Sequence, residues 1–365
     1  MRVCDLAPAH IRAISPYQPG KPISELAREM GLAEASIVKL ASNENPLGIG
    51  ERTRAAINAS LADIARYPDG NGFELKDALC RRYGVKMSQI VLGNGSNDIL
   101  ELAAGAFLGP DRDAVYAQHA FAVYPLATQA AGARGIEVPA KNFGHDLEAM
   151  LAAITPATRV IFIANPNNPT GTFVPGPELE AFLARVPAEV LVVLDEAYTE
   201  YLAPAQRYDA IAWIERFPNL LISRTFSKAY GLAGLRVGYG LGNPEVIDLL
   251  NRVRQPFNVT SVGLAAAAAA LFDDDFLQRS FEMNLAGMAQ LTEGFARLGL
   301  DWIPSAGNFV TFKVGDGAKV NAGLLRQGVI VRPIAAYGMP EWLRVSIGLE
   351  SENARFLEAL PAALA

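Results

Sequence analysis

Short apolar runs alternate with segments of helical length through the first two thirds of the chain. Seven runs have the length of buried strands, at residues 89–92, 113–117, 135–138, 159–163, 190–194, 220–223 and 235–239. Strands that alternate with helices are typical of an open, mostly parallel sheet with helices on both faces. We therefore predict an α/β fold, in which ligands bind beyond the carboxyl ends of the strands.

The pattern changes towards the C-terminus. Apolar runs there predict strands at residues 308–312, 329–332 and 343–347, followed by a closing helix at 351–364. At the other end, several prolines surround Tyr17 and break any long helix. We expect an N-terminal arm that packs with a small domain, a large domain, and that smaller α+β domain, over residues 1–45, 46–269 and 270–365 respectively.

Composition narrows the class of protein. The chain has 365 residues, with 32 basic and 38 acidic side chains and a formal net charge of −6, which disfavours nucleic acid and anionic membranes as partners. Cys4 and Cys80 have no metal or redox spacing, and His119 has no ligand partner nearby, so we expect free thiols and no metal site. The N-terminus lacks the apolar core of a signal peptide, and the longest apolar run, 264–272, is too short to span a bilayer. These features predict a soluble, cytoplasmic protein.

The stretch from Ser223 to Gly240 carries the strongest chemical signal. Lys228 follows a strand-like run, Thr225 and Ser227 place hydroxyls beside it, and Arg236 comes eight residues later. A lysine amine can form a Schiff base with an aldehyde, and hydroxyls with a guanidinium can hold a phosphate. The stretch therefore suits a phosphorylated aldehyde cofactor, although a surface lysine in a glycine-rich turn would have the same sequence.

Other unusual residues also follow predicted strands. Gly95, Ser96 and Asn97 precede a helix and offer backbone N–H groups to an anion, although an ordinary N-cap would use the same residues. Phe121 could lie against a flat ring or simply pack in the core. Further strand ends carry an asparagine-rich loop at 165–171 and Asp195 at the end of an apolar run. Together these residues meet the needs of pyridoxal 5'-phosphate (PLP), which requires an amine, a carboxylate at its ring nitrogen and a phosphate site.

Several segments resemble the fold-type-I PLP-dependent aminotransferases, and most closely the histidinol-phosphate aminotransferases among them. These segments are SNENP at 42–46, RYPD at 66–69, GNGSND at 93–98, NPNNPTG at 165–171, DEAY at 195–198 and SKAYGLAGLRVGY at 227–239. The resemblance runs from Tyr17 to Arg344 and implies that the large domain binds PLP. Two departures are Phe121 where a tyrosine is common and Ser96-Asn97-Asp98 where an acidic pair often follows the serine.

The resemblance also implies a role for each site residue. Lys228 would bind the cofactor covalently and then act as general acid and base, while Asp195 would pair with the protonated ring nitrogen. Asn168 and Tyr198 would bond the ring oxygen, and Phe121 would stack on the ring. The phosphate would be held by Gly95, Ser96, Asn97, Thr225, Ser227 and Arg236. Tyr67 would reach the phosphate in the neighbouring subunit, which makes a homodimer the functional unit.

The substrate side of the predicted site is rich in arginine. Arg344, Arg332 and Tyr17 suit a phosphate dianion better than a single carboxylate, and Asn43 is a further predicted substrate contact. From sequence alone, a structural ion pair is the alternative for either arginine. The expected reaction is transfer of the amino group between L-histidinol phosphate and 2-oxoglutarate, a step of histidine biosynthesis. The alternatives are an aromatic amino acid aminotransferase, a PLP-dependent decarboxylase and a PLP-sensing regulator. A regulator would need a DNA-binding module, which neither the short arm nor the net charge provides.

Overall fold

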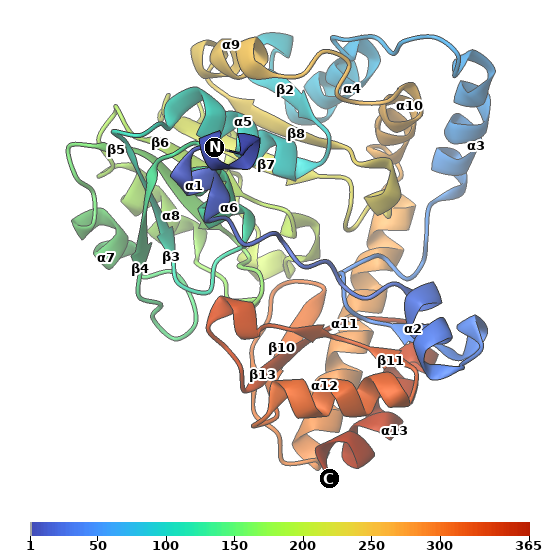
Figure 1. Ribbon diagram of the computed structural model, residues 1–365. Coiled ribbons are helices and arrows are strands. Elements are labelled where there is room, and N and C mark those ends of the chain that lie inside the picture. Colours follow the sequence, from blue (N-terminus) through green and yellow to red (C-terminus); the bar gives the residue numbers. More distant parts are fainter. Residues whose placement is uncertain (1) are drawn as a thin grey trace.

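The computed structural model describes residues 2–365 and is built around a seven-stranded sheet (Figure 1). The strand order is β2-β8-β7-β6-β5-β3-β4, and all neighbours from β7 to β4 are parallel, whereas β8 is antiparallel to both its neighbours. The strands are β2 (Ile90–Gly93), β3 (Asp113–Ala117), β4 (Arg134–Val138), β5 (Thr158–Ala164), β6 (Leu191–Asp195), β7 (Leu220–Thr225) and β8 (Gly238–Gly242). The expected α/β fold with a mostly parallel sheet is confirmed.

One strand begins later than the sequence predicts. The expected run at 235–239 becomes β8 only at Gly238, because Ala233–Leu235 form a 3-10 turn and Arg236 has a φ of 55°. This left-handed conformation is uncommon for a residue with a side chain. The turn points the Arg236 guanidinium towards Ser227 instead of along a strand, with 3.2 Å between Nη1 and the serine Oγ.

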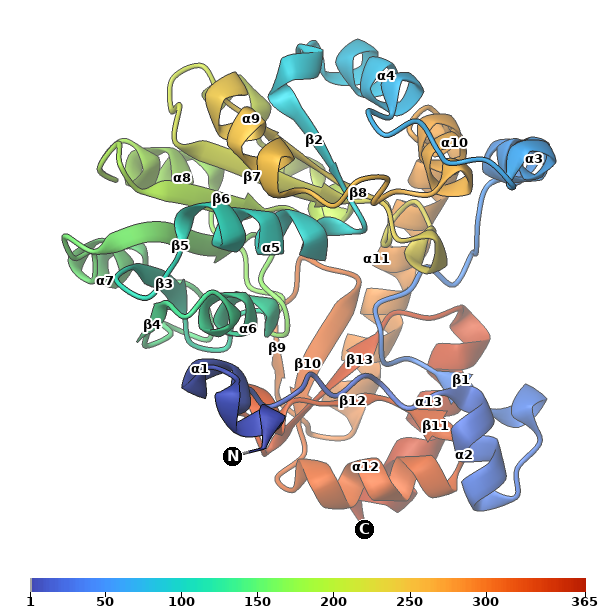
Figure 2. The ribbon, with the colours of Figure 1, turned by 45° about the horizontal axis from the view of Figure 1, so that its top comes forward.

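Helices cover both faces of the sheet, as Figure 2 shows for α5 and α9 on one side. That side holds α5 (Ser96–Phe107), α6 (Val123–Ala130) and α9 (Pro244–Val253), which bury apolar side chains against alternate residues of the strands. The other side holds α4 (Phe73–Tyr83), α7 (Leu147–Ala152), α8 (Gly176–Leu183) and α10 (Ser261–Ala270), and α3 (Glu51–Ser60) packs on α10. Both faces of the central strands are therefore buried, which explains their continuous apolar sequence.

A smaller antiparallel sheet lies at the C-terminal end of the chain. Its order is β12-β13-β10-β9, and the strands are β9 (Trp302–Ile303), β10 (Phe309–Lys313), β12 (Arg332–Pro333) and β13 (Trp342–Ser346). Three helices pack with it: α11 (Asp274–Arg297), α12 (Gly317–Arg326) and α13 (Glu350–Leu364). Phe295 stacks on Phe312 with ring centroids 4.6 Å apart, and Phe356 meets both rings edge-on. The strand expected at 329–332 is split into β11 (Val329–Ile330) and β12, which join different sheets.

The N-terminal arm contacts both parts of the molecule (Figure 1). Its strand β1 (Val38–Lys39) pairs in parallel with β11, and α2 (Ile23–Met30) buries Leu26 beside Ile330. Its first helix, α1 (Ala9–Arg12), instead lies near α6, where Gln129 Nε2 donates to the carbonyl of His10 at 3.1 Å. The arm thus crosses from one domain to the other, while the boundaries predicted at residues 45 and 269 stay predictions.

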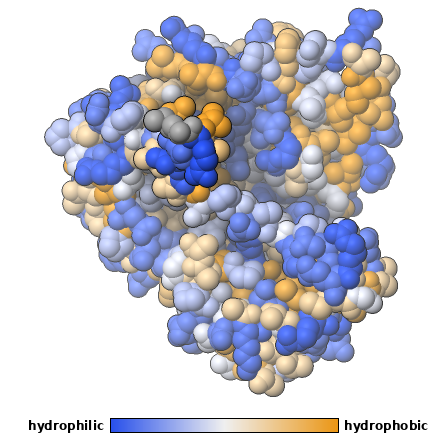
Figure 3. Space-filling model, in the orientation of Figure 1, coloured by the Kyte–Doolittle hydropathy of each residue, from blue (hydrophilic) through white to orange (hydrophobic). Residues whose placement is uncertain are grey.

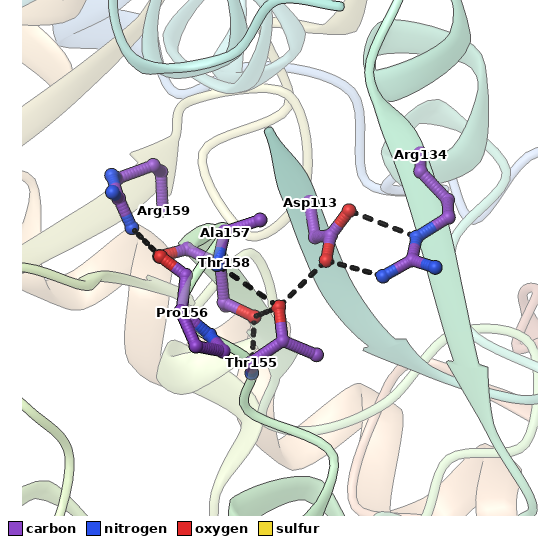
Figure 4. Close-up of polar contacts among 7 residues, drawn as sticks. All are labelled: Asp113, Arg134, Thr155, Pro156, Ala157, Thr158 and Arg159. Carbon is purple, nitrogen blue, oxygen red and sulfur yellow. Dashed lines mark hydrogen bonds and ion pairs between the residues drawn. The ribbon is translucent and has the colours of Figure 1, made fainter. Parts of the chain in front are cut away.

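A polar cluster joins the amino ends of two neighbouring strands (Figure 4). The buried Asp113 carboxylate accepts both guanidinium N–H groups of Arg134, at 2.9 and 2.6 Å, and the Thr155 hydroxyl at 2.7 Å. Arg134 holds the pKa of Asp113 below its usual range. These contacts connect the start of β3 to β4 and to the loop before β5, at the opposite end of the sheet from the predicted site.

Over residues 2–365, no helix has the length and apolar character needed to cross a membrane.

Candidate functional site

One cavity of about 200 Å³ lies at the carboxyl ends of the central strands. The predicted site residues that line it are Tyr17, Asn43, Ser96, Asn97, Phe121, Asn168, Asp195, Tyr198, Thr225, Ser227, Lys228, Arg236, Arg332 and Arg344. Gly95 and Tyr67 do not line it. The residues come from the arm, the carboxyl ends of five strands (β2, β3, β5, β6 and β7), the turn before β8 and the small domain, so the cavity lies where the parts of the molecule meet.

Lys228 follows β7 and places its amine in this cavity. Its Nζ donates to the backbone carbonyl of Ser42 in the arm at 3.2 Å and lies 5.7 Å from the ring centroid of Tyr198. Burial, together with the nearby guanidinium of Arg344, lowers the pKa of the Lys228 amine to about 8. A larger share of unprotonated amine at neutral pH makes this lysine a better nucleophile than an exposed one.

Asp195 is the last residue of β6 and is buried in the cavity wall. Its Oδ2 accepts the phenol hydrogen of Tyr124 at 2.8 Å, whereas its Oδ1 has no hydrogen-bond partner among residues 2–365. Burial raises the pKa of this carboxyl to about 6, and the Tyr124 hydrogen bond acts in the opposite direction. A buried carboxylate oxygen without a partner is costly. The Oδ1 atom of Asp195 can therefore accept a hydrogen bond from a group that binds in the cavity.

An anion site forms where α5 begins. Gly95 precedes the helix with a φ of 81°, and Gly238 of β8 approaches so closely that a Cβ there would lie 2.4 Å from the Ser96 nitrogen. Arg236 comes from the other side, and its Nη1 donates to the Ser227 hydroxyl at 3.2 Å. Helix N–H groups, a hydroxyl and a guanidinium converge there, which is the donor set that a phosphate requires. Gly95 shapes this site without lining the cavity.

Two polar side chains and one aromatic ring complete the wall. Tyr198 accepts a hydrogen bond from Asn43 Nδ2 at 3.0 Å, and Asn168 Oδ1 accepts one from Arg344 Nη1 at 2.5 Å. Phe121, just before α6, presents its ring to the cavity and meets Tyr124 edge-on with centroids 5.9 Å apart. With these acceptors occupied, the Tyr198 O–H and the Asn168 N–H groups are the donors that these two side chains offer in a cavity also lined by Phe121.

The two arginines predicted from the sequence are neighbours in the small sheet. Arg332 of β12 lies directly opposite Arg344 of β13 in the antiparallel pairing, which explains their separation of twelve residues. Arg344 is buried, and its Nη2 donates to the carbonyl of Ala41 at 2.7 Å. The Arg332 guanidinium lies over the ring of Tyr17, 5.2 Å from its centroid, and donates to the carbonyl of Gln18 at 2.7 Å. The two guanidinium groups therefore place positive charge in the cavity lining next to the N-terminal arm.

Sequence reasoning missed several contacts of the cavity. It offered Tyr124, like Phe121, only as an aromatic that could lie against a flat ring, whereas the structure bonds its hydroxyl to Asp195 across 71 positions of the chain. Ser42 begins one of the recognised segments, but its backbone carbonyl, which accepts from Lys228, has no sequence signal. Tyr337 also lines the cavity, in a turn between β12 and β13 that shows no motif. No group of three or more metal-ligating side chains occurs within the described part of the chain.

Comparisons with known proteins agree with this geometry. Residues 35–360 match the family described as aminotransferase class I and II. The histidinol-phosphate aminotransferase of Methylobacillus flagellatus is 67% identical over 98% of this chain and 97% of its own length. A second relative, histidinol-phosphate aminotransferase 2 of Nitrosospira multiformis, is 64% identical over 100% of this chain and 93% of its own length. Among solved structures, the histidinol-phosphate aminotransferase of Sinorhizobium meliloti, in complex with pyridoxal-5'-phosphate, superposes with a TM-score of 0.90 at 28% identity, over 98% of this chain and 96% of that one.

Proposed function

Because this chain belongs to the class I and II aminotransferases, we propose that it transfers the amino group of L-histidinol phosphate to 2-oxoglutarate with PLP as cofactor. The observation that carries the proposal is one cavity lined by Lys228, by Asp195, whose Oδ1 has no partner among residues 2–365, and by the phosphate-binding candidates Thr225, Ser227 and Arg236. The identity of 61–67% to relatives named for histidinol phosphate supports this substrate over other amino donors.

The residues of the cavity fit PLP. The unpartnered Asp195 Oδ1 is the acceptor that a protonated ring nitrogen needs. Because Gly238 has no Cβ, no side chain there crowds the Ser96 nitrogen at the start of α5, where the phosphate would bind. Lys228 offers its Nζ to the aldehyde carbon, and Phe121 offers a ring face. We propose that the phosphate is held by Gly95, Ser96, Asn97, Thr225, Ser227 and Arg236. When bound, PLP supplies an electron-withdrawing ring that stabilises negative charge on the substrate carbon.

Side chains of the protein then transfer the proton of the substrate carbon and compensate the charge on the ring nitrogen. Lys228 Nζ acts as general base on the hydrogen of the substrate carbon and returns that proton as general acid. Its pKa of about 8 suits both tasks near neutral pH. Asp195, with a pKa of about 6, is mostly ionised at pH 7 and compensates the positive charge of a protonated ring nitrogen. Tyr198 and Asn168 donate hydrogen bonds to the ring oxygen and fix the orientation of the ring.

Two arginines select an anionic tail on the substrate. Arg344 has a buried Nε without a partner among the described residues, and Arg332 lies opposite it with its guanidinium over Tyr17. We propose that this pair, with Tyr17 and Asn43, binds the phosphate of histidinol phosphate in one half-reaction and a carboxylate of 2-oxoglutarate in the other. A phosphate dianion gains more from two guanidinium groups than the single carboxylate of an aromatic amino acid does.

A side-by-side measurement of turnover tests the proposed substrate. The kcat/KM for histidinol phosphate should exceed the values for phenylalanine and tyrosine, with 2-oxoglutarate as acceptor. The reverse order would make the protein an aromatic amino acid aminotransferase. Release of carbon dioxide from an amino acid would point to a decarboxylase, and bound cofactor without any amino transfer would point to a regulator. In the same preparation, Lys228→Ala should abolish the visible absorbance of lysine-bound cofactor.

We also propose that the functional unit is a homodimer. Tyr67 is 83% exposed, its ring stacks on Phe257 at 4.8 Å, and neither residue lines the cavity of its own chain. Nearby Leu61 and Ile64 are also exposed, where hydrophobic residues gather after α3 (Figure 3). Such a patch is typical of a protein interface. Tyr67 would then complete the phosphate site of the other copy.

Mixing two inactive variants tests this arrangement. Lys228→Ala removes the amine, and Tyr67→Ala removes the residue assigned to the neighbouring site. In a mixed dimer, one site has both Lys228 and the Tyr67 supplied across the interface, so activity should return on mixing and exchange. Sedimentation should give the mass of two chains. A monomer with full activity, or no recovery on mixing, would contradict the proposal.

We expect the enzyme to work in the cytoplasm, which cell fractionation can test.

A further inference from the structure

Tyr124 is a fully buried tyrosine that lines the cavity together with Asp195. Its ring stacks on Phe162 with centroids 4.9 Å apart and an angle of 5°, so the phenol has little freedom to turn. Its hydroxyl donates to Asp195 Oδ2 at 2.8 Å. Burial and the neighbouring Asp195 raise the pKa of this phenol well above its usual range, so the hydroxyl keeps its hydrogen and stays a donor.

The two oxygens of Asp195 are therefore in different states. Oδ2 is occupied by Tyr124, whereas Oδ1 has no partner within residues 2–365 although Asp195 lines the cavity. A carboxylate with one oxygen anchored cannot rotate freely, so the second oxygen keeps a fixed direction. Burial raises the pKa of Asp195, and the Tyr124 hydrogen bond is the largest influence that lowers it. The backbone N–H of Ala197 and the amine of Lys228 also lower this pKa, whereas the neighbouring Glu196 raises it.

We propose that Tyr124 is a positioning residue that keeps Asp195 ionised and holds its Oδ1 towards the ring nitrogen of the cofactor. This inference rests on the proposed function, since it concerns the PLP site. Without the phenol, Oδ2 would be buried without a donor, the carboxyl would protonate more readily, and its hold on a protonated ring nitrogen would weaken. Tyr124 touches neither the ring nitrogen nor the substrate in this mechanism and acts only through Asp195.

The test compares two cofactors on the apoprotein. Tyr124→Phe removes one oxygen atom and leaves the stacked ring in place. Binding of PLP and of 1-deazapyridoxal 5'-phosphate, which has carbon in place of the ring nitrogen, is measured by quenching of protein fluorescence. We expect Tyr124→Phe to weaken PLP binding about tenfold, as for loss of a hydrogen bond to a charged group, and to change binding of the deaza compound less than twofold. In the Asp195→Ala background, Tyr124→Phe should change PLP binding less than twofold.

Tyr239→Phe is the matched control, because Tyr239 is equally buried and its hydroxyl contacts Tyr83 at 2.9 Å instead of Asp195. It should leave the ratio of the two binding constants unchanged. Equal weakening for both cofactors in Tyr124→Phe would show a merely structural role, and no weakening would also overturn the inference. If the wild-type protein itself failed to bind PLP, the proposed function would fail instead.

A second measurement needs no deletion in the core. Uniform labelling with 3-fluorotyrosine makes every phenol a stronger donor, and an effect through a tyrosine that does not act on Asp195, such as Tyr198, would persist in Asp195→Ala. The preference for PLP over the deaza compound should increase in the wild-type protein and stay constant in Asp195→Ala. An unchanged preference in the wild-type protein would overturn the inference even if Tyr124→Phe did not fold.

Discussion

Replacing Gly238 with alanine should crowd the backbone of Gly95 and Ser96, where we propose that the phosphate of PLP binds. A Cβ at this position would lie 2.4 Å from the Ser96 nitrogen, 2.5 Å from the Gly95 carbonyl carbon and 2.9 Å from Ser96 Cα. All three are backbone atoms, so no side chain can rotate away, and the start of α5 must move away from β8. Overpacking of this kind costs about 1–3 kcal/mol. The helix N–H groups that we assign to the phosphate would move with it.

The expected result is a weaker affinity for PLP. If the whole strain is relieved by displacing the phosphate site, the dissociation constant rises by roughly 5- to 150-fold, since about 1.4 kcal/mol corresponds to a factor of ten. Fluorescence titration of the apoprotein with PLP measures this directly. Thermal unfolding of the same apoprotein shows how much of the cost appears as lost stability instead.

Gly105→Ala is the control on the same helix. Gly105 lies near the far end of α5, is exposed, and has open space where a Cβ would be added, so alanine should stabilise the helix by roughly 0.5–1 kcal/mol and leave PLP binding unchanged. Equal affinity for PLP in Gly238→Ala and in the wild-type protein would refute the reasoning. An equal loss of PLP affinity in both variants would show that any change in α5 weakens binding. It would then give no support to a phosphate contact at the start of α5.

Three further predictions follow from the contacts described above. Asp195→Ala should retain some cofactor but lose about 3 kcal/mol of transition-state stabilisation, which single-turnover kinetics would show as a fall of about a hundredfold in rate; full activity would refute the assigned role. Arg332→Ala should raise the KM for histidinol phosphate while kcat changes little, because it removes one of two cationic contacts; an unchanged KM would exclude Arg332 from the substrate site. The pKa of Asp113 is lowered by Arg134, so its stabilising effect is complete above its unfolded pKa of about 3.9 and is lost as the pH falls through the lower folded value. Thermal unfolding of Asp113→Asn and the wild-type protein should therefore differ at pH 7 and converge near pH 2, and a constant difference would contradict this linkage.

Local sequence was sufficient for most of the fold. Most strands of the large sheet are apolar runs of the right length, whereas the edge strand β4 reads RGIEV and is mostly exposed. Hydrophobic periodicity depends only on residues close together in the chain. The start of β8 was predicted too early because Ala233–Leu235 form a 3-10 turn and Arg236 has a left-handed backbone, which hydrophobic periodicity does not indicate. The split between β11 and β12 has a similar cause, since the two halves pair with different sheets.

The sequence by itself determined which chemical groups are available for the site: a lysine among hydroxyls, an aspartate at a strand end, a glycine-rich helix start and two arginines. Only the tertiary structure decided how they are coupled. Tyr124 donates to Asp195, Lys228 to the carbonyl of Ser42, and Asn43 to Tyr198, and these contacts join residues at least 71 positions apart. Directions of side chains and carbonyl groups depend on packing between distant elements, because a hydrogen bond requires two atoms within about 3 Å whatever their separation along the chain.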